Sequence, residues 1–294
     1  MLQGNHAQAL ALAAATRNIP AHIVMPSIST PSKIAATQSY GAHVIFSGST
    51  SVEREAVVAR VQAETGAVLV PPYDHVDIIL GQGTLALEFE EQVKEMTRTA
   101  KGGQGGSEGL DAVVAPCGGG GMLSGVATAL VGTGIAVFGA EPSFEGADDC
   151  RRGLREGRRV ESVATLTIAD GLRTPVGEIP WRVISDVTKV RAVYSVSEEQ
   201  IKSAMRLIVE RMKVVVEPSA AVGLAVVLFD EEFRRVVEKE AGEEVWNVGV
   251  VLSGGNTTLE AMGKLFAAES EAKGERETGK VGMNGEKVAE NVAG

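Results

Sequence analysis

The chain has 294 residues, of which 44% are hydrophobic and 22% are charged, and its formal net charge at pH 7 is −10. This is the composition of a soluble globular protein with a sizeable core, and the negative charge argues against a nucleic-acid backbone as the main partner. There is no apolar run of about 18 residues for a membrane span, no signal-peptide pattern, and too few cysteines for a disulfide framework. We therefore expect a cytoplasmic protein that acts on a small molecule and binds neither nucleic acid nor membrane.

Helical and β-rich patterns alternate along the chain, which is typical of α/β architecture with parallel strands. An Ala-rich helix is under way at Asn5, and Thr50 and Glu53 have the spacing of a capping box. These patterns predict a small βαβαβ lobe over residues 1–74. Its expected elements after the first helix are strands at 21–26, 43–46 and 67–72 and helices at 30–41 and 50–66.

Residues 75–265 predict a second, larger lobe. A Gly-rich connector at 101–109 interrupts it, and a looser polar region runs to about residue 180. Mixed charge and the absence of aromatic residues from Ala267 onward predict a disordered tail over 266–294. The elements expected in the large lobe are helices at 81–96, 122–131, 197–213 and 217–229 and strands at 110–116, 135–141 and from about 246.

Four consecutive glycines lie between an apolar strand and an apolar helix. Backbone N–H groups that no side chain obstructs, at a helix N-terminus, favour an anion such as phosphate. The lysine of a P-loop does not follow, and the glycine spacing and later acidic residue of a dinucleotide fingerprint are missing. A flexible loop is the alternative, but the position favours a phosphate-bearing cofactor. The glycines are Gly118, Gly119, Gly120 and Gly121.

Three other stretches each allow two interpretations. Ser253 follows a predicted strand. It is either the cap of the next helix or a neutral hydroxyl that faces a heterocyclic nitrogen. Asn5 and His6 stand at the start of a predicted helix. A simple Asn cap and a site for a substrate carboxylate explain them equally well. The loop 141–150 by itself is a solvated acidic loop, with oxygen ligands for Mg²⁺ or Ca²⁺ as the alternative.

Together these stretches resemble the fold-type II pyridoxal 5′-phosphate (PLP) enzymes, specifically the serine racemase and serine/threonine dehydratase group. The resemblance implies an α/β, tryptophan synthase β-like fold of two open parallel-sheet lobes with PLP between them, assembled as a homodimer. The stretches follow the family's order from residue 4 to about 265. They are GNHAQALALAA, IPAHIVMP, PSKIAATQSYGA, GQGTLALE, CGGGGMLSG, AEPSFEGADDC, IADGLRT, ERMKVVVEPSAAVGLA and VVLSGGN.

The resemblance also implies site residues. The glycines and the N–H of Met122 would hold the cofactor phosphate, Ser253 would face the pyridine nitrogen, and Asn5 would bond the phenolic oxygen. The implied cofactor residues are Asn5, Gly118, Gly119, Gly120, Gly121, Met122, Gly171, Glu217 and Ser253. The substrate carboxylate would be held by Gln3, Gly4, Asn5 and His6, and a divalent cation, Mg²⁺ or Ca²⁺, by Glu141, the carbonyl of Ala147 and Asp149.

Two departures from the family pattern bear on activity. Gln3 occupies the position where the racemases have a serine that acts as acid and base, and an amide cannot shuttle a proton. The family's Schiff-base lysine lies a few dozen residues before the Gly-Asn-His loop, and this sequence begins after that point. Neither Lys33 nor Lys213 matches that lysine. We therefore expect no catalytic lysine in the sequence as given, and little or no activity from it.

The implied family activity is a PLP-dependent ammonia-lyase (dehydratase) reaction on L-serine, L-threonine or a similar hydroxy-amino acid such as 3-hydroxyaspartate, with racemisation as a side activity. The sequence would then be an incomplete form of an active dehydratase, which is the favoured interpretation. The alternatives are a non-catalytic homologue that binds PLP or an amino acid and pairs with a complete subunit, and an unstable remnant that aggregates.

Overall fold

The computed structural model of the chain describes residues 4–29, 31–100 and 109–267. Gln3, most of the predicted connector (101–108) and the tail residues 268–294 lie outside the described part. The chain divides into two compact units, Met1–Asn256 and Thr257–Gly294. Both sheets belong to the first unit, and the described part of the second is helical at 259–267. The expected division at residues 74 and 265 remains a prediction.

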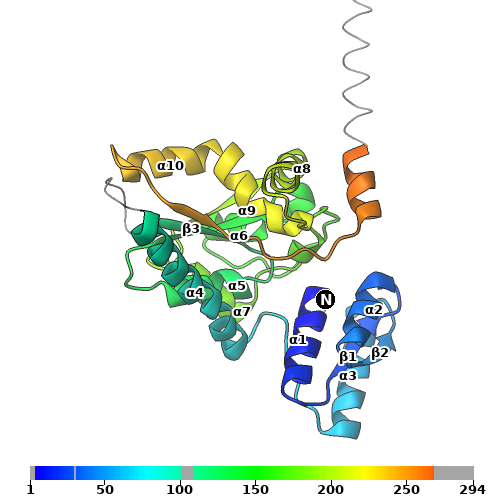
Figure 1. Cartoon of the computed structure of the whole chain (residues 1–294). Coiled ribbons are helices and arrows are strands. Elements are labelled where there is room, and N and C mark those ends of the chain that lie inside the picture. Colours follow the sequence, from blue (N-terminus) through cyan, green and yellow to red (C-terminus); the bar gives the residue numbers. More distant parts are fainter. Residues whose placement is uncertain (1–3, 30, 101–108, 268–294) are drawn as a thin grey trace, which may run out of the picture. The chain divides into compact units, whose positions relative to one another are not determined.

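The first sheet consists of two parallel strands, β1 (His22–Pro26) and β2 (His43–Ser47), in register from His22 opposite His43. Ile23 and Met25 of β1 pack with Ala7 in a small core. Three predicted helices accompany this sheet (Figure 1) and are confirmed as α1 (Gly4–Thr16), α2 (Pro31–Ser39) and α3 (Ser51–Thr65).

The capping box predicted for α3 is present. The side chain of Thr50 accepts a hydrogen bond from the backbone N–H of Glu53, and the Glu53 carboxylate accepts one from the backbone N–H of Thr50. Gly66 ends the helix in the left-handed region, at φ 69°. Both helix boundaries are set by local side-chain and backbone chemistry, which explains why the sequence locates them.

The prediction of a strand at 67–72 is wrong, because these residues form no strand. Val68 is 86% exposed and Leu69 is 52% exposed, so this apolar run lacks the cover that a buried strand requires. The carbonyl of Val70 accepts a hydrogen bond from the His6 ring instead of joining a ladder. The first sheet is therefore a βαβ arrangement, followed by α3 and a segment without regular secondary structure.

The second sheet has four parallel strands in the order β5-β4-β3-β6. Its central pairing sets Ala112 opposite Ala136 and Pro116 opposite Ala140. The predicted strands 110–116, 135–141 and the one near 246 are confirmed. The strands are β3 (Ala112–Pro116), β4 (Ala136–Pro142), β5 (Ala192–Val196) and β6 (Val248–Val250).

Helices cover both faces of this sheet (Figure 1), with α5 on one face and α9 on the other. Val113, Val114 and Phe138 are consequently fully buried, which explains why the strands read as continuous apolar runs. The predicted helices are confirmed as α4 (Val76–Ala100), α5 (Gly121–Ala129), α8 (Glu198–Leu207) and α9 (Pro218–Phe229), and α8 continues as the π-helical turn η3 (Ile208–Met212).

Several elements had no counterpart in the sequence prediction. The polar region up to residue 180 contains short helices rather than loose chain, and strand β5 and helix α10 were missed. Strand β5 has only five residues and therefore no long periodic pattern, and seven of the eleven residues of α10 are charged. The additional helices are η1 (Phe144–Gly146), α6 (Asp149–Glu156), η2 (Asp170–Leu172), α7 (Glu178–Ile184) and α10 (Glu231–Ala241).

Parallel strands bring their carboxyl ends to one edge of the sheet. The glycine loop follows β3, Glu141 lies near the end of β4, and Ser253 follows β6. The fold thus gathers the chemically interesting stretches at that edge. Within the described residues, none of the helices combines the length and apolar character that crossing a membrane requires.

Candidate functional site

A cavity of about 300 Å³ lies at this edge, within the first compact unit. Every residue that the resemblance assigned to the cofactor lines it, although these residues come from widely separated stretches. The first three glycines come from the β3–α5 loop, Gly121 and Met122 begin α5, and Glu217 and Ser253 come from much later in the sequence. The lining residues are Asn5, His6, Ala9, Pro72, Tyr73, Gln82, Pro116, Gly118, Gly119, Gly120, Gly121, Met122, Gly171, Leu172, Glu217, Ser219 and Ser253.

The glycine loop is packed too tightly for side chains. A Cβ on Gly119 would lie 2.3 Å from a ring carbon of Tyr73, closer than real Cβ contacts. Gly120 caps α5 with φ at 84°, in the left-handed region where glycine is favoured. The carbonyl of Gly119 accepts a hydrogen bond from the N–H of Gly177, which fixes the loop. The result is a rigid concave turn of backbone at the N-terminus of α5, the arrangement that binds anions.

The side chain of Asn5, in the cavity wall, is hydrogen-bonded to two other side chains. The Asn5 side-chain amide donates to Glu217 Oε1 at 2.5 Å, and the amide of Asn256 donates to Asn5 Oδ1 at 2.5 Å. The backbone N–H of Glu217 donates to the carbonyl of Gly254. Burial raises the pKa of Glu217, and the hydrogen bond from Asn5 opposes that effect. Asn5 is therefore held from both ends, with one amide hydrogen left for a ligand.

His6 is a neutral group in this site. Burial lowers the pKa of its ring, only partly opposed by the hydrogen bond with the carbonyl of Val70. That bond requires the hydrogen on Nε2, which makes Nδ1 the acceptor. Gly4, the first described residue of the predicted carboxylate site, begins α1 but does not line the cavity.

The wall that carries Gly171 is tied to other elements. The N–H of Gly171 donates to Ser219 Oγ at 2.9 Å. Its neighbour Asp170 forms an ion pair with Lys33, with 2.8 Å between Nζ and Oδ2. Lys33 lies on α2, so this pair connects the helices of the first sheet to the η2 wall of the cavity.

Sequence reasoning missed two notable lining residues. Tyr73 covers the glycine loop, and burial raises the pKa of its hydroxyl. Ser219 fixes Gly171. Ser219 lies in a stretch that carried the resemblance, so its position next to Glu217 was an available signal. Tyr73 follows the apolar run 67–72 and has no comparable signal in the sequence.

The predicted cation ligands lie on β4 and at the start of α6. The fully buried Glu141 carboxylate accepts hydrogen bonds from the backbone N–H groups of Cys150, at 3.2 Å, and Arg151, at 2.7 Å. Burial raises the pKa of Glu141 well above its usual value. Burial also raises the pKa of Asp149 to about 6, although its carboxylate accepts a hydrogen bond from the N–H of Val176. Ala147, the third predicted ligand, is buried in the same loop.

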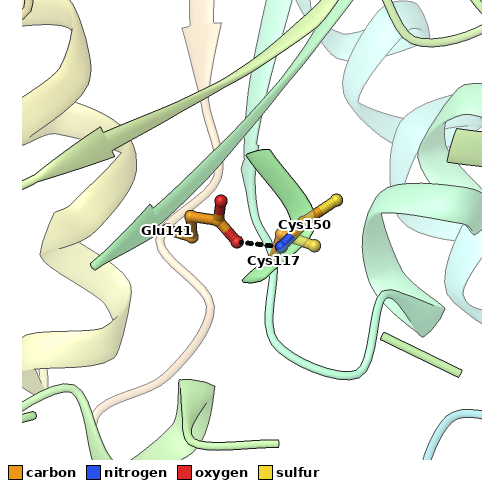
Figure 2. A group of neighbouring side chains, drawn as sticks. All are labelled: Cys117, Glu141 and Cys150. Atoms are coloured by element: carbon orange, nitrogen blue, oxygen red, sulfur yellow. Dashed lines mark hydrogen bonds between the residues drawn. The ribbon is translucent and has the colours of Figure 1, made fainter. Parts of the chain in front are cut away.

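Both cysteines lie beside Glu141, a grouping that sequence reasoning did not anticipate. The ligand atoms of Cys117, Glu141 and Cys150 all lie within 4.8 Å of one another. Figure 2 shows the three residues as neighbours, with the hydrogen bond from the Cys150 backbone N–H to the Glu141 carboxylate. The hydrogen bond with Cys117, followed by burial, raises the pKa of the Cys150 thiol well above its usual value.

A second cavity, of about 470 Å³, lies along α4 and β6. It contains none of the predicted site residues, and its surroundings offer only Glu88 as an ionisable side chain. The smaller cavity at the sheet edge is therefore the stronger candidate, because a ligand site needs convergent polar groups.

Comparison with known proteins agrees with this geometry. A family model described as "Pyridoxal-phosphate dependent enzyme" matches residues 2–254. Serine racemase from Arabidopsis thaliana is 41% identical over 265 residues, which cover 90% of this chain and 73% of that protein. L-threo-3-hydroxyaspartate ammonia-lyase from Saccharomyces cerevisiae is 40% identical over 271 residues, which cover 91% of this chain and 75% of that protein.

Solved structures give the same result for the fold. Maize serine racemase superimposes with a TM-score of 0.76 at 39% identity, covering 93% of this chain and 76% of the maize chain. A threonine deaminase from T.th. has a TM-score of 0.73 at 38% identity, covering 87% of this chain and 76% of that structure. The chain therefore belongs to the pyridoxal-phosphate dependent enzymes of fold-type II.

Proposed function

We propose that the cavity of about 300 Å³ binds PLP and serves an ammonia-lyase (dehydratase) reaction on L-serine, L-threonine or a related hydroxy-amino acid. The observation that carries the proposal is the convergence of all the expected cofactor residues on one cavity. The relatives named serine racemase, hydroxyaspartate ammonia-lyase and threonine deaminase support the reaction class.

The residues present fit PLP. The turn formed by Gly118, Gly119, Gly120 and Gly121 offers backbone N–H groups at a helix N-terminus, and a Cβ at Gly119 would collide with Tyr73. This cradle suits a phosphate dianion. Ser253 is a neutral hydroxyl that can meet the pyridine nitrogen without protonating it, and Asn5 has an amide hydrogen free for the phenolic oxygen.

When bound, PLP supplies an electron sink for the bond broken at the substrate's α-carbon. The chain's own residues bind and orient. The α1 N-terminus, with Gln3, Gly4, Asn5 and His6, would receive the substrate carboxylate, helped by the helix dipole. His6 is neutral, so it contributes a polar contact rather than a charge. Gly171 and Glu217 would flank the ring, Gly171 held by Ser219 and Glu217 by Asn5.

Dehydration is favoured over racemisation. Gln3 stands where a racemase needs an acid and base, and its amide exchanges no proton at neutral pH. The chain by itself is proposed to have little or no activity, because no lysine lines the described cavity. Lys33 is engaged with Asp170, and the exposed Lys213 bonds to the carbonyl of Glu210.

A second site is proposed for a divalent cation, Mg²⁺ or Ca²⁺, held by Glu141, Asp149 and the carbonyl of Ala147. The two carboxylates are nearly inaccessible to solvent, with residue exposures of 1% and 3%. Their hydrogen bonds come from backbone N–H groups rather than side-chain cations, and each carboxylate has further lone pairs. Hard cations take such oxygen ligands. Assembly as a homodimer and a cytoplasmic location complete the proposal.

A non-catalytic role is the second candidate, favoured by the same absence of lysine from the described cavity lining. In that case the chain binds PLP or an amino acid and pairs with a complete subunit. The two candidates share the cofactor site, and both expect little or no turnover from the chain alone, so the experiment below tests that site and that inactivity rather than separating the two candidates.

The test is to add PLP to the purified chain, reduce with borohydride, map any pyridoxyl-lysine by mass spectrometry and assay ammonia release from L-serine, L-threonine and L-threo-3-hydroxyaspartate. Saturable PLP binding without a labelled lysine and without ammonia supports a cofactor site that lacks its lysine. A labelled lysine with turnover contradicts the inactivity of the chain. Absence of saturable PLP binding in folded protein contradicts the proposed cofactor site.

A further inference from the structure

The two cysteines of the chain meet at one buried point. Cys117 is the first residue after β3, Cys150 is the second residue of α6, and each is 1% exposed. Glu141 on β4 lies between these elements and is also 1% exposed. The strand register explains the meeting, since Pro116 lies opposite Ala140 and the next residues are Cys117 and Glu141.

The charge at this point is uncompensated by side chains. The groups that act electrostatically on the Glu141 carboxyl are Cys117 and Asp149, which are both acidic. In the described part of the chain, no Lys or Arg forms an ion pair with Glu141. The two nearest arginines in sequence point elsewhere, since Arg151 bonds Ser195 and Glu232 and Arg152 bonds Asp148. A buried carboxyl group without a cationic partner keeps its proton unless a metal ion binds it, and the pKa of Glu141, which burial raises, agrees with this.

The donor set differs from that of a Mg²⁺ or Ca²⁺ site. Two sulfur ligands and one carboxylate suit zinc-class cations, whereas hard cations take oxygen alone. All three ligand atoms lie within 4.8 Å of one another, which is the range for donors around one ion. Figure 2 shows the side chains of Cys117 and Cys150 on the same side of Glu141.

We propose that Cys117, Cys150 and Glu141 form a binding site for a zinc-class divalent cation at the base of the glycine loop. This site extends the cation site of the proposed function, because Glu141 belongs to both. Two S–H bonds break and two sulfur–metal bonds and one bond from a Glu141 oxygen to the metal form; the two thiol protons go to solvent, together with the proton of Glu141 where that carboxyl group is protonated, so two thiolates and a carboxylate surround the dication. The bound ion ties the β3–α5 loop to α6 and competes with Mg²⁺ or Ca²⁺ for Glu141.

The experiment uses the full chain, reduced, freed of metal by a chelator, and without PLP. Cd²⁺ is the probe, because cadmium–thiolate bonds absorb in the ultraviolet. The chain has only two cysteines, so any such absorption reports this cluster. We expect absorption that saturates at one Cd²⁺ per monomeric chain, is displaced by Zn²⁺, and is accompanied by a higher melting temperature.

Two variants distinguish this site from the proposed Mg²⁺ or Ca²⁺ site, whose ligands are all oxygen atoms. Cys117→Val keeps a similar volume and should abolish the absorption, whereas Asp149→Asn should retain it and lose the response to Ca²⁺. If Cys117→Val does not fold, the second measurement is the slow alkylation of the two buried thiols of the native chain through transient opening, which one equivalent of Zn²⁺ should slow further.

The inference is overturned if the folded native chain gives no absorption with excess Cd²⁺, if Zn²⁺ protects neither thiol, or if Cys117→Val binds Cd²⁺ like the native chain. PLP binding is measured separately on the same preparation. If the native chain binds PLP but not Cd²⁺, only this inference is contradicted. If it binds Cd²⁺ but not PLP, only the proposed cofactor site is contradicted.

Discussion

Lys33 Nζ lies 2.8 Å from Asp170 Oδ2, although the two residues are 137 positions apart in the sequence. Lys33 belongs to α2, beside the two-stranded sheet, and Asp170 begins η2, whose next residue is Gly171 in the cavity wall. The side chains are 25% and 41% exposed, so solvent screens the pair. Its importance lies in placing Gly171 rather than in overall stability.

Lys33→Met should therefore affect the cavity more than the fold. We expect a loss of at most about 1 kcal/mol in the free energy of unfolding, as for other solvent-screened ion pairs. Affinity for PLP should fall by ~3–10-fold, since 1.4 kcal/mol corresponds to tenfold. Fluorescence titration with PLP checks this. Lys94→Met, which removes an exposed pair within α4, is the control and should leave the affinity unchanged. Equal effects of both variants would contradict the role of the Lys33–Asp170 pair.

Gly119→Ala should damage the phosphate cradle. The added Cβ meets the Tyr73 ring at 2.3 Å, so either the ring or the loop must move. Overpacking of this kind costs about 1–3 kcal/mol, and we expect PLP affinity to fall by more than ~10-fold. Gly81→Ala is the matched control, because nothing lies within 4 Å of its Cβ position. In a Tyr73→Ala background, Gly119→Ala should cost much less stability than in the native chain, and an equal cost in both backgrounds would contradict the proposed collision.

Glu217→Gln should change the pH dependence of stability. Burial raises the pKa of Glu217 in the folded chain, so the folded state holds this proton more tightly than the unfolded state does. The free energy of unfolding contributed by Glu217 therefore decreases as the pH rises from its ordinary value of 4.5 through the raised one. Glutamine does not titrate, and it keeps an oxygen that accepts from Asn5.

The difference in unfolding free energy between Glu217→Gln and the native chain should thus increase with pH across that window and then stay constant. Denaturant unfolding at several pH values from 4 upward measures it. Lys33 also acts electrostatically on Glu217, so the same difference measured between Lys33→Met and the double variant Lys33→Met/Glu217→Gln shows how much Lys33 changes the slope. A difference that is flat or falls with pH would contradict the raised pKa.

Asp149→Asn tests the oxygen site for a hard cation. Asparagine keeps an acceptor for the N–H of Val176, so the loop should still form, but one ligand charge is lost. Ca²⁺ or Mg²⁺ should raise the melting temperature of the native chain in a concentration-dependent way and leave that of the variant unchanged. Asp148→Asn alters the neighbouring acidic residue, which pairs with Arg152, and should retain the response. A native chain whose melting temperature ignores both ions would contradict this site.

The parts of the fold that the sequence predicts well depend on local signals. The capping box of Thr50 and Glu53 and the glycine loop are contained within a few residues, and both appear as expected. The extended run 67–72 failed because strand formation depends on a partner and on cover, and the apolar pattern carries neither. Strand β5 was missed for the related reason that its five residues acquire their identity from pairing with β4.

The site was predictable as a set of motifs, but the contacts between them were not. Asn5 with Glu217 and Lys33 with Asp170 join residues more than a hundred positions apart, and no local pattern in one stretch encodes its partner. The meeting of Cys117 with Glu141 depends on the register of two strands, because a shift of one residue would place Ala140 or Pro142 there instead.

Because both thiols are buried where β3, β4 and α6 meet, their rate of modification is a probe of the opening of the four-stranded sheet. A thiol reagent cannot reach either sulfur while these elements remain packed, so its reaction rate follows the fraction of molecules in which they have separated. No other cysteine in the chain reacts, so the measured rate has no contribution from elsewhere. Ligands that bind at the sheet edge should lower this modification rate. The factor by which each ligand lowers it reports how strongly that ligand stabilises the closed sheet.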